Sequence, residues 1–164
     1  MAVLRRLTSE YVEGEDRIRL SGELDSGEVV VMWLTRRLLE RLIRVLVRWC
    51  ETAWHDQPNR ELLQGFAQQS AQTAHEPQPP VAGCEVSRQW LVECIDMQFG
   101  AEDVGLVFRG GTVEACIDFA PTALRQWLGI LRQAYRIAEW PLDVWPAWMA
   151  FDADTAASKA VLLH

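Results

Sequence analysis

The hydrophobic and polar residues form three short runs with strand character in the first third of the chain. Val3–Tyr11 alternates weakly, whereas Arg17–Leu24 alternates aliphatic residues with arginine and serine, which is typical of a half-buried strand. Glu28–Trp33 is a run of β-branched and large side chains that suits a buried strand. Turn-forming residues separate the runs, so we predict three consecutive strands.

Helical spacing begins after Thr35, whose hydroxyl can cap a helix that continues to about Trp54. The second half of the chain repeats this order. Gln89–Phe99, Val104–Phe108 and Val113–Phe119 have strand character, and Arg109 to Thr112 predicts a tight hairpin. Pro121 suits the first position of a helix that runs to about Glu139.

These similar units, Glu15–Trp49 and Glu102–Tyr135, predict an α+β fold. An ungapped alignment pairs Trp33 with Phe119 and Leu42 with Leu128. Identities are few, and any two hairpin-plus-helix units would share much of this pattern, so duplication is one of two explanations. We predict a single domain over residues 1–164, in which two βββα-like halves form one antiparallel or mixed sheet packed by two main amphipathic helices.

Residues 56–83 lie between the halves and are rich in glutamine and proline. Part of this stretch has helical spacing, while Pro77, Pro79 and Pro80 exclude both a helix and a central strand. We therefore predict a connector with a short helix, acting as a linker or as a lid over a site.

The two predicted helices share one apolar stripe but differ beside it. Leu39, Ile43, Leu46 and Val47 in the first helix correspond to Arg125, Gly129, Arg132 and Gln133 in the second. The first helix should therefore bury an extra face and the second should not. Either the connector or the C-terminal segment covers that face, or it binds a partner, because a large apolar patch is rarely left exposed.

The C-terminal segment, residues 140–164, is rich in tryptophan. Proline residues interrupt it, so its indoles do not form a helical stripe. They either pack over the core as a strap or form a docking segment, since tryptophan is frequent at binding hot spots. Together with the first helix, this segment supplies the predicted partner-binding residues: Leu39, Ile43, Leu46, Val47, Trp54, Trp140, Trp145 and Trp148.

Composition narrows the choice of partner. The chain has 164 residues, 49% apolar content and a net charge of −7, which suits a folded domain and argues against a general nucleic-acid surface. Arg37, Arg41, Arg44 and Arg48 lie near one face of the first helix, and we expect them to pair with acidic neighbours or with a partner carboxylate.

Candidate chemistry is sparse. The four cysteines form no CxxC pair, so we predict no metal site and reduced, apolar thiols. Asp96, Glu114 and Asp118 are more simply explained by a solvated sheet face than by acid–base catalysis, and no nucleophile motif or cofactor signature is present. The N-terminus lacks a signal-peptide core and no segment can span a membrane, which predicts a cytoplasmic protein.

We therefore expect a non-enzymatic protein–protein interaction or assembly module that binds itself, as a homodimer, or another protein. The alternative is a small-ligand-binding domain whose cleft lies between the two βββα halves. A flat apolar patch on the first helix would favour the interaction module, and a concave pocket would favour ligand binding.

Overall fold

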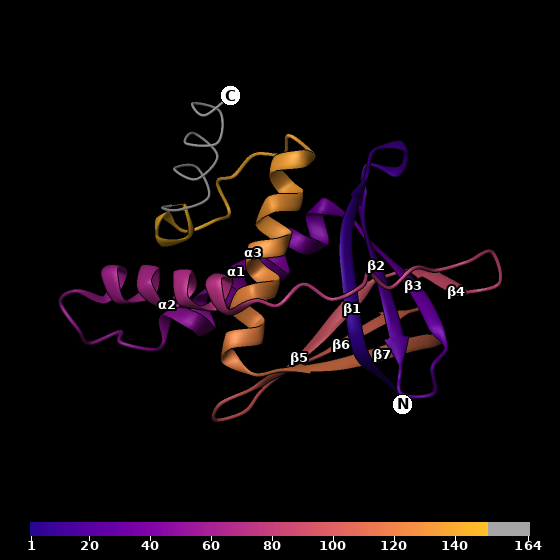
Figure 1. Ribbon diagram of the computed structural model, residues 1–164, viewed down its shortest axis with the longest axis horizontal. Coiled ribbons are helices and arrows are strands. Elements are labelled where there is room, and N and C mark those ends of the chain that lie inside the picture. Colours follow the sequence, from indigo (N-terminus) through magenta and orange to yellow (C-terminus); the bar gives the residue numbers. More distant parts are fainter. Residues whose placement is uncertain (151–164) are drawn as a thin grey trace.

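A computed structural model describes residues 1–150 and contains one seven-stranded mixed sheet with three α-helices (Figure 1). The strand order is β4-β3-β2-β1-β7-β6-β5. The strands are β1 (Ala2–Val12), β2 (Arg17–Leu24), β3 (Val29–Leu34), β4 (Arg88–Leu91), β5 (Cys94–Phe99), β6 (Val104–Gly110) and β7 (Val113–Phe119). The helices are α1 (Arg36–Glu51), α2 (Arg60–Ala74) and α3 (Pro121–Ile137), with 3-10 turns η1 (Glu13–Glu15) and η2 (Ala147–Met149).

Two antiparallel meanders make up the sheet, β1-β2-β3 and β5-β6-β7. They meet through a parallel pairing of β1 with β7, and β4 adds in parallel to β3 at one edge. The predicted mixed sheet packed by amphipathic helices is confirmed. Each meander is followed by a helix, but this order does not in itself establish a duplication, which stays a hypothesis.

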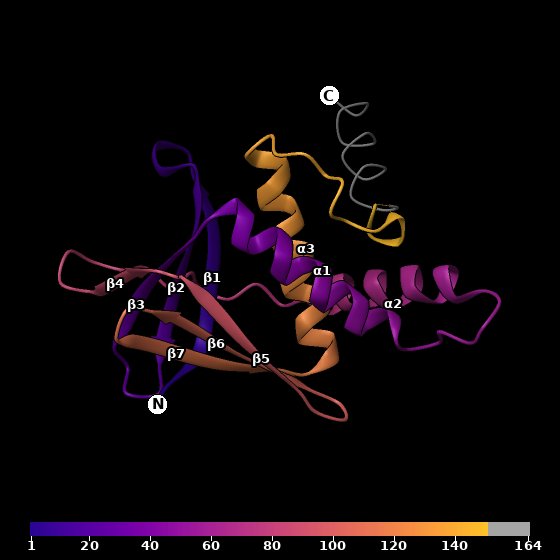
Figure 2. The same ribbon diagram turned by 180° about the vertical axis from the view of Figure 1, so that it is seen from behind.

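The sheet curls until its two edges approach each other (Figure 2). The amide of Val92 donates to the carbonyl of Trp33 on β3, at 2.9 Å, while the next amide, Glu93, donates to the carbonyl of Arg109 on β6, at 2.8 Å. Two consecutive residues thus bond to β3 and β6, which lie near opposite edges of the sheet. Gly110 permits this closure, because a Cβ atom there would overlap the Leu91 carbonyl oxygen.

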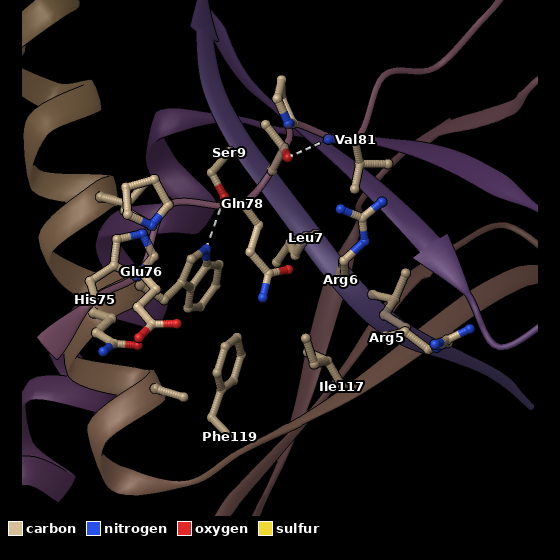
Figure 3. Close-up of a pocket in the computed structure, with 18 of the residues that line it drawn as sticks. Arg5, Arg6, Leu7, Ser9, His75, Glu76, Gln78, Val81, Ile117 and Phe119 are labelled. Atoms are coloured by element: carbon tan, nitrogen blue, oxygen red, sulfur yellow. Dashed lines mark hydrogen bonds between the residues drawn. The ribbon is translucent and has the colours of Figure 1, made fainter. Parts of the chain in front are cut away.

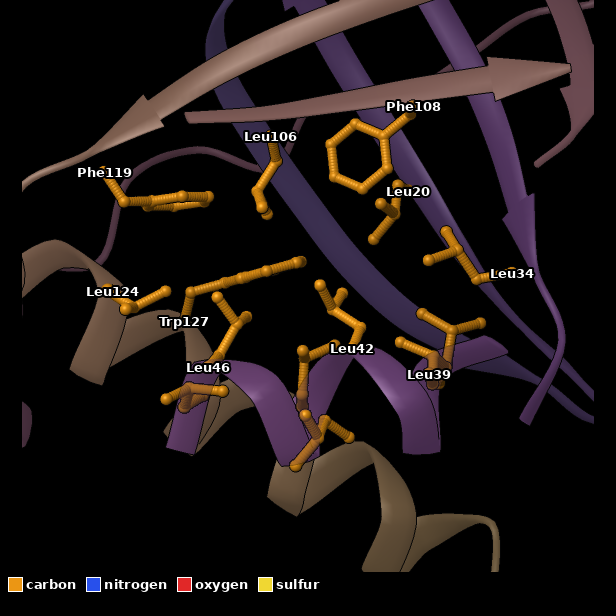
Figure 4. Close-up of a cluster of buried hydrophobic side chains, with 14 of the residues drawn as sticks. Leu20, Leu34, Leu39, Leu42, Leu46, Leu106, Phe108, Phe119, Leu124 and Trp127 are labelled. Carbon is orange, nitrogen blue, oxygen red and sulfur yellow. The ribbon is translucent and has the colours of Figure 1, made fainter. Parts of the chain in front are cut away.

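Helix α1 packs between the sheet and α3, which explains its extra apolar face. Thr35 caps it, accepting a hydrogen bond from the Leu38 amide at 3.3 Å. Figure 4 shows Leu42 and Leu46 pointing toward the sheet residue Leu106 and toward Trp127 of α3. A helix with the sheet on one side and a second helix on the other needs apolar residues over a wide arc. The covering is therefore intramolecular.

Helix α3 also buries a second face, contrary to the sequence prediction. Arg125 and Arg132 are only 7% and 5% exposed. Helix α2 packs on this face, where Gly129 lies beside the side chains of Gln68 and Gln72. Polar residues on a helix can thus be buried when the covering helix supplies hydrogen-bond partners.

Helix α2 has 15 residues and lies in the part of the connector that has helical spacing. Its glutamines, which suggested a linker, anchor it to its neighbours. Buried Gln64 donates to the Cys50 carbonyl of α1 at 2.8 Å, and buried Gln68 donates to the Arg125 carbonyl of α3 at 2.8 Å. The Gln64 side-chain oxygen in turn accepts from Arg125 at 2.5 Å. These amides satisfy main-chain and guanidinium groups that would otherwise be buried without partners.

After α2, residues 75–87 cross the outer face of the first meander to reach β4; we call them the strap (Figure 1). The Val81 amide donates to the Thr8 hydroxyl at 2.8 Å, and Arg6 donates to the Pro79 carbonyl at 3.0 Å. Val81 is 5% exposed and Ser21 of β2 is 1% exposed. The strap therefore covers part of the sheet.

The tryptophan-rich segment packs on the end of α3. The Tyr135 ring makes edge-to-face contacts with Trp140 and Trp145, with centroids 5.0 and 5.4 Å apart. Trp148 Nε1 donates to Glu51 at 3.0 Å. All three indoles are less than 10% exposed. This agrees with the alternative in which the C-terminal segment packs over the core, as far as residues 140–150 are concerned. Residues 151–164 of the predicted segment lie outside the described part of the chain.

One carboxylate ties this segment to the β1–β2 hairpin. Asp16 accepts hydrogen bonds from Tyr11 Oη at 2.8 Å and Trp140 Nε1 at 3.1 Å. The Tyr11 bond, followed by the Trp140 bond, lowers the pKa of Asp16 below its ordinary value. A lowered carboxyl pKa stabilises the fold above the unfolded-state pKa of about 3.9, and the effect disappears as the pH falls through the folded-state pKa.

We therefore expect Asp16→Asn to reduce the acid sensitivity of the fold. Between about pH 5 and pH 2, the free energy of unfolding should fall less steeply for the variant than for the wild type. Urea titrations at several pH values measure this slope. Parallel pH profiles for the two proteins would show that ionised Asp16 does not stabilise the fold.

Candidate functional site

A cleft opens where β1 and β7 separate. These parallel strands are paired only at Ala2 with Ala115 and Val3 with Cys116. A register shift in the pairing of β1 with β2 follows at once, between Leu4 and Arg6. Such an irregularity bends and twists a strand. Beyond it β1 follows β2, so a gap is left between β1 and the end of β7.

The floor of the cleft is aromatic. Trp127 reaches across from α3, and its indole nitrogen donates to the Ser9 hydroxyl of β1 at 2.9 Å. Its ring stacks on Phe119 of β7 with centroids 5.0 Å apart and an angle of 13° between the planes. Both rings are less than 10% exposed. The indole is therefore held at both strands, and its position is set by the fold before any ligand arrives.

The strap forms one wall of the cleft, whose volume is about 640 Å³ (Figure 3). Leu7 of β1, Ile117 of β7 and Ile130 of α3 line it and are only half-buried. Gln78 of the strap projects over the opening (Figure 3). A volume of this size, with apolar walls and a few polar groups, matches the usual dimensions of small-molecule sites.

Two neighbouring arginines mark the rim of the cleft. Arg6 is engaged with Glu23 at 2.5 Å, and this hydrogen bond lowers the pKa of the Glu23 carboxyl. Arg5 is exposed and makes no ion pair or hydrogen bond with any residue in the described range 1–150. The Arg5 guanidinium therefore remains available to an anionic group, which it can bind with two parallel hydrogen bonds.

The predicted partner-binding residues lie elsewhere. Leu39, Ile43 and Leu46 are 0% exposed and Val47 is 8% exposed, all within this one chain. The extra face of α1 is thus not a surface, because α3 and the sheet occupy it. Trp140, Trp145 and Trp148 are buried as described above, and of the predicted residues only Trp54 is substantially exposed, at 39%.

A second hollow lies between α2 and η2, with a volume of about 650 Å³. Leu62 and Phe66 line it and are 56% and 58% exposed, with Trp148 at its side. Trp148 is thus a predicted partner-binding residue that lies beside a hollow.

Sequence reasoning offered a cleft between the two halves as an alternative, but it did not identify the residues that line this one. It assigned Trp127 to an ordinary core stripe, and it singled out neither Arg5 nor Ile117. The signal that could have found them is a pair of adjacent arginines in a strand that otherwise alternates. Such a break in alternation is expected at a β-bulge, where two residues of one strand lie opposite a single residue of the neighbouring strand.

The remaining candidate carboxylates behave as expected for a solvated face. Arg109 bridges Asp96 of β5, at 2.5 Å, and Glu114 of β7. The residues of range 1–150 contain no cluster of three or more potential metal ligands. No helix in that range is both long and apolar enough to cross a membrane.

Comparisons with protein-family models, with curated proteins and with solved structures find no match to this chain. Its function must therefore be argued from its own residues.

Proposed function

We propose that the protein is a small-ligand-binding domain and that the cleft between β1 and β7 holds an amphipathic molecule with one anionic group. The observation that carries this proposal is the combination of half-exposed aliphatic walls with the exposed guanidinium of Arg5 at the rim, which forms no salt bridge or hydrogen bond within residues 1–150. Apolar surface left accessible in a concave site is favourable to cover. The apolar body would contact Leu7, Ile117 and Ile130, and the anion would meet Arg5.

The two parallel strand contacts of the sheet differ in length, which supports this site. Strands β3 and β4 pair in parallel through four consecutive residues, from Val30 with Arg88 to Trp33 with Leu91. Strands β1 and β7 pair in parallel through only two residues each. The short contact leaves room for the cleft. We also include in the proposal that the two halves arose by duplication.

The strap suits the role of a wall that adjusts to a ligand. Residues 75–80 are exposed, and three of them are prolines. Proline limits the number of backbone conformations, so ordering such a segment over a ligand loses less entropy than ordering a flexible loop. The free thiols of Cys50, Cys84, Cys94 and Cys116 suit the cytoplasmic setting that we also propose.

Two dyes test the site directly. Anilinonaphthalene sulfonate has an apolar body and one anionic group, and N-phenyl-naphthylamine is its uncharged counterpart. We expect both dyes to bind with a rise in dye fluorescence. Arg5→Gln should lower the affinity for the anionic dye about tenfold, because one charge-assisted contact is lost. The affinity for the neutral dye should not change.

Ile117→Asn should weaken both dyes, because it places an amide on the apolar wall. Phe66→Asn is the matched control: it changes an exposed apolar residue in the second hollow, so both affinities should stay the same. Unfolding curves check that each variant is folded. Dye binding that responds to Phe66→Asn and not to Ile117→Asn would move the site to the second hollow and refute the cleft proposal.

A further inference from the structure

The solvent-facing side of α1 carries a stripe of four arginines. Arg37, Arg41, Arg44 and Arg48 are all exposed. At about 100° per residue they fall within an arc of about 60°, directly opposite the buried residues Leu39 and Leu46. The stripe is thus not a scatter of surface charges, because every one of these guanidinium groups points away from the core.

Within residues 1–150 the stripe does not form the pairs with acidic neighbours that the sequence led us to expect. Within residues 1–150, none of its four arginines makes an ion pair or a hydrogen bond. Arginines elsewhere in the same range do pair with carboxylates, namely Arg6, Arg19, Arg36, Arg88 and Arg109. Like charges three and four residues apart disfavour a helix. The spacing of the four arginines therefore opposes folding slightly.

An apolar edge runs beside the stripe. Leu38, Val45 and Trp49 occupy the adjoining helical row and are half-buried. The ring of Trp49 stacks on Phe99 at the end of β5, with centroids 6.2 Å apart, and Phe99 is 47% exposed. Arginine beside aromatic and aliphatic side chains is the composition that recurs at the centre of protein–protein interfaces.

We propose that this surface of α1 docks an acidic, amphipathic segment of another protein. Carboxylates on that segment would pair with the arginines, and its apolar residues would cover Leu38, Val45, Trp49 and Phe99. The stripe spans about three helical turns, so a helix of similar length with acidic residues at the same spacing fits it. This surface is separate from the ligand cleft, and either proposal can fail alone.

The occupant is a protein segment and not a nucleic acid for two reasons. The chain has 23 acidic against 16 basic residues, so its overall field repels a long polyanion. The apolar edge would make no favourable contact with a phosphate backbone, because basic and polar groups make the contacts to phosphates. A short acidic segment meets only the local charge, because salt screens more distant charges beyond about 8–10 Å.

A labelled synthetic helix tests the proposal. The probe carries glutamates at the spacing of the four arginines and leucines on the adjoining face, and a second peptide has glutamine in place of each glutamate. We expect fluorescence anisotropy to show binding of the glutamate peptide alone, weakening as salt is raised. Arg41→Glu with Arg44→Glu should weaken it at least about tenfold.

Arg17→Glu with Arg60→Glu is the matched control, since it changes the net charge equally at positions outside α1, and it should leave the peptide affinity within about twofold. No binding of the glutamate peptide to the folded wild type, or equal binding by the two double variants, would refute the proposal. So would tighter binding of a DNA or RNA duplex through the same arginines. A dimer, seen by light scattering, that Arg41→Glu with Arg44→Glu dissolves would assign the surface to a second copy instead.

Discussion

Replacing Ile43 with glutamate is expected to unfold the protein. Ile43 is 0% exposed at the centre of α1 and belongs to the hydrophobic core. The change removes a fully buried aliphatic side chain and buries a carboxyl group in its place. Together these effects should destabilise the fold by about 4–5 kcal/mol or more, a large part of the stability of an ordinary domain.

Circular dichroism and urea denaturation measure this loss. Arg41→Glu is the matched control, because it introduces the same residue on the exposed side of the same helix, and it should leave the free energy of unfolding within about 0.5 kcal/mol. The result also decides the role of α1. An Ile43→Glu protein that stays folded and merely changes its mass in solution would show that this face is an interface after all.

Trp140→Ala is expected to give the second largest effect. Its indole makes edge-to-face contacts with Tyr11 at 5.4 Å and Tyr135 at 5.0 Å, and it is 7% exposed. It therefore joins the β1–β2 hairpin to the end of α3. Removing a buried tryptophan typically lowers the free energy of unfolding by about 3–5 kcal/mol, through lost contacts and an unfilled cavity.

Trp54 offers the control, because it is 39% exposed and lies after α1. Trp54→Ala should change the free energy of unfolding by less than about 1 kcal/mol. Chemical denaturation followed by far-ultraviolet circular dichroism compares the two variants without relying on tryptophan emission. Equal stabilities for Trp140→Ala and Trp54→Ala would mean that the C-terminal segment is not part of the core.

Most elements of the fold were predictable from local pattern. Arg17–Leu24 was predicted and observed with the same bounds, and Pro121 begins α3 as expected. The helix after Thr35 ends at Glu51, three residues before the predicted Trp54. Gln89–Phe99 proved to be two strands, β4 and β5, because the chain passes there from one edge of the curled sheet to the other. A long-range closure of this kind leaves no local signal.

The burial of two glutamines of α2 could not be predicted for a related reason. Glutamine-rich helical spacing is typical of a solvated connector, yet Gln64 and Gln68 are 3% and 2% exposed. Their amides bond to carbonyl groups of α1 and α3. Whether a polar side chain is buried depends on the partners around it, and those partners come from residues distant in sequence.

The sequence by itself determined which residues of this protein avoid water. It identified the sheet strands, the stripe shared by α1 and α3, and the extra apolar face of α1, since periodicity records the direction in which each side chain points. Only the tertiary structure decided what covers each face. The partner for Leu39, Ile43, Leu46 and Val47 is the chain itself, and the cleft exists because β1 and β7 separate after two pairs. An apolar face must be covered by other residues, but the hydrophobic effect is non-directional and does not specify which residues cover it.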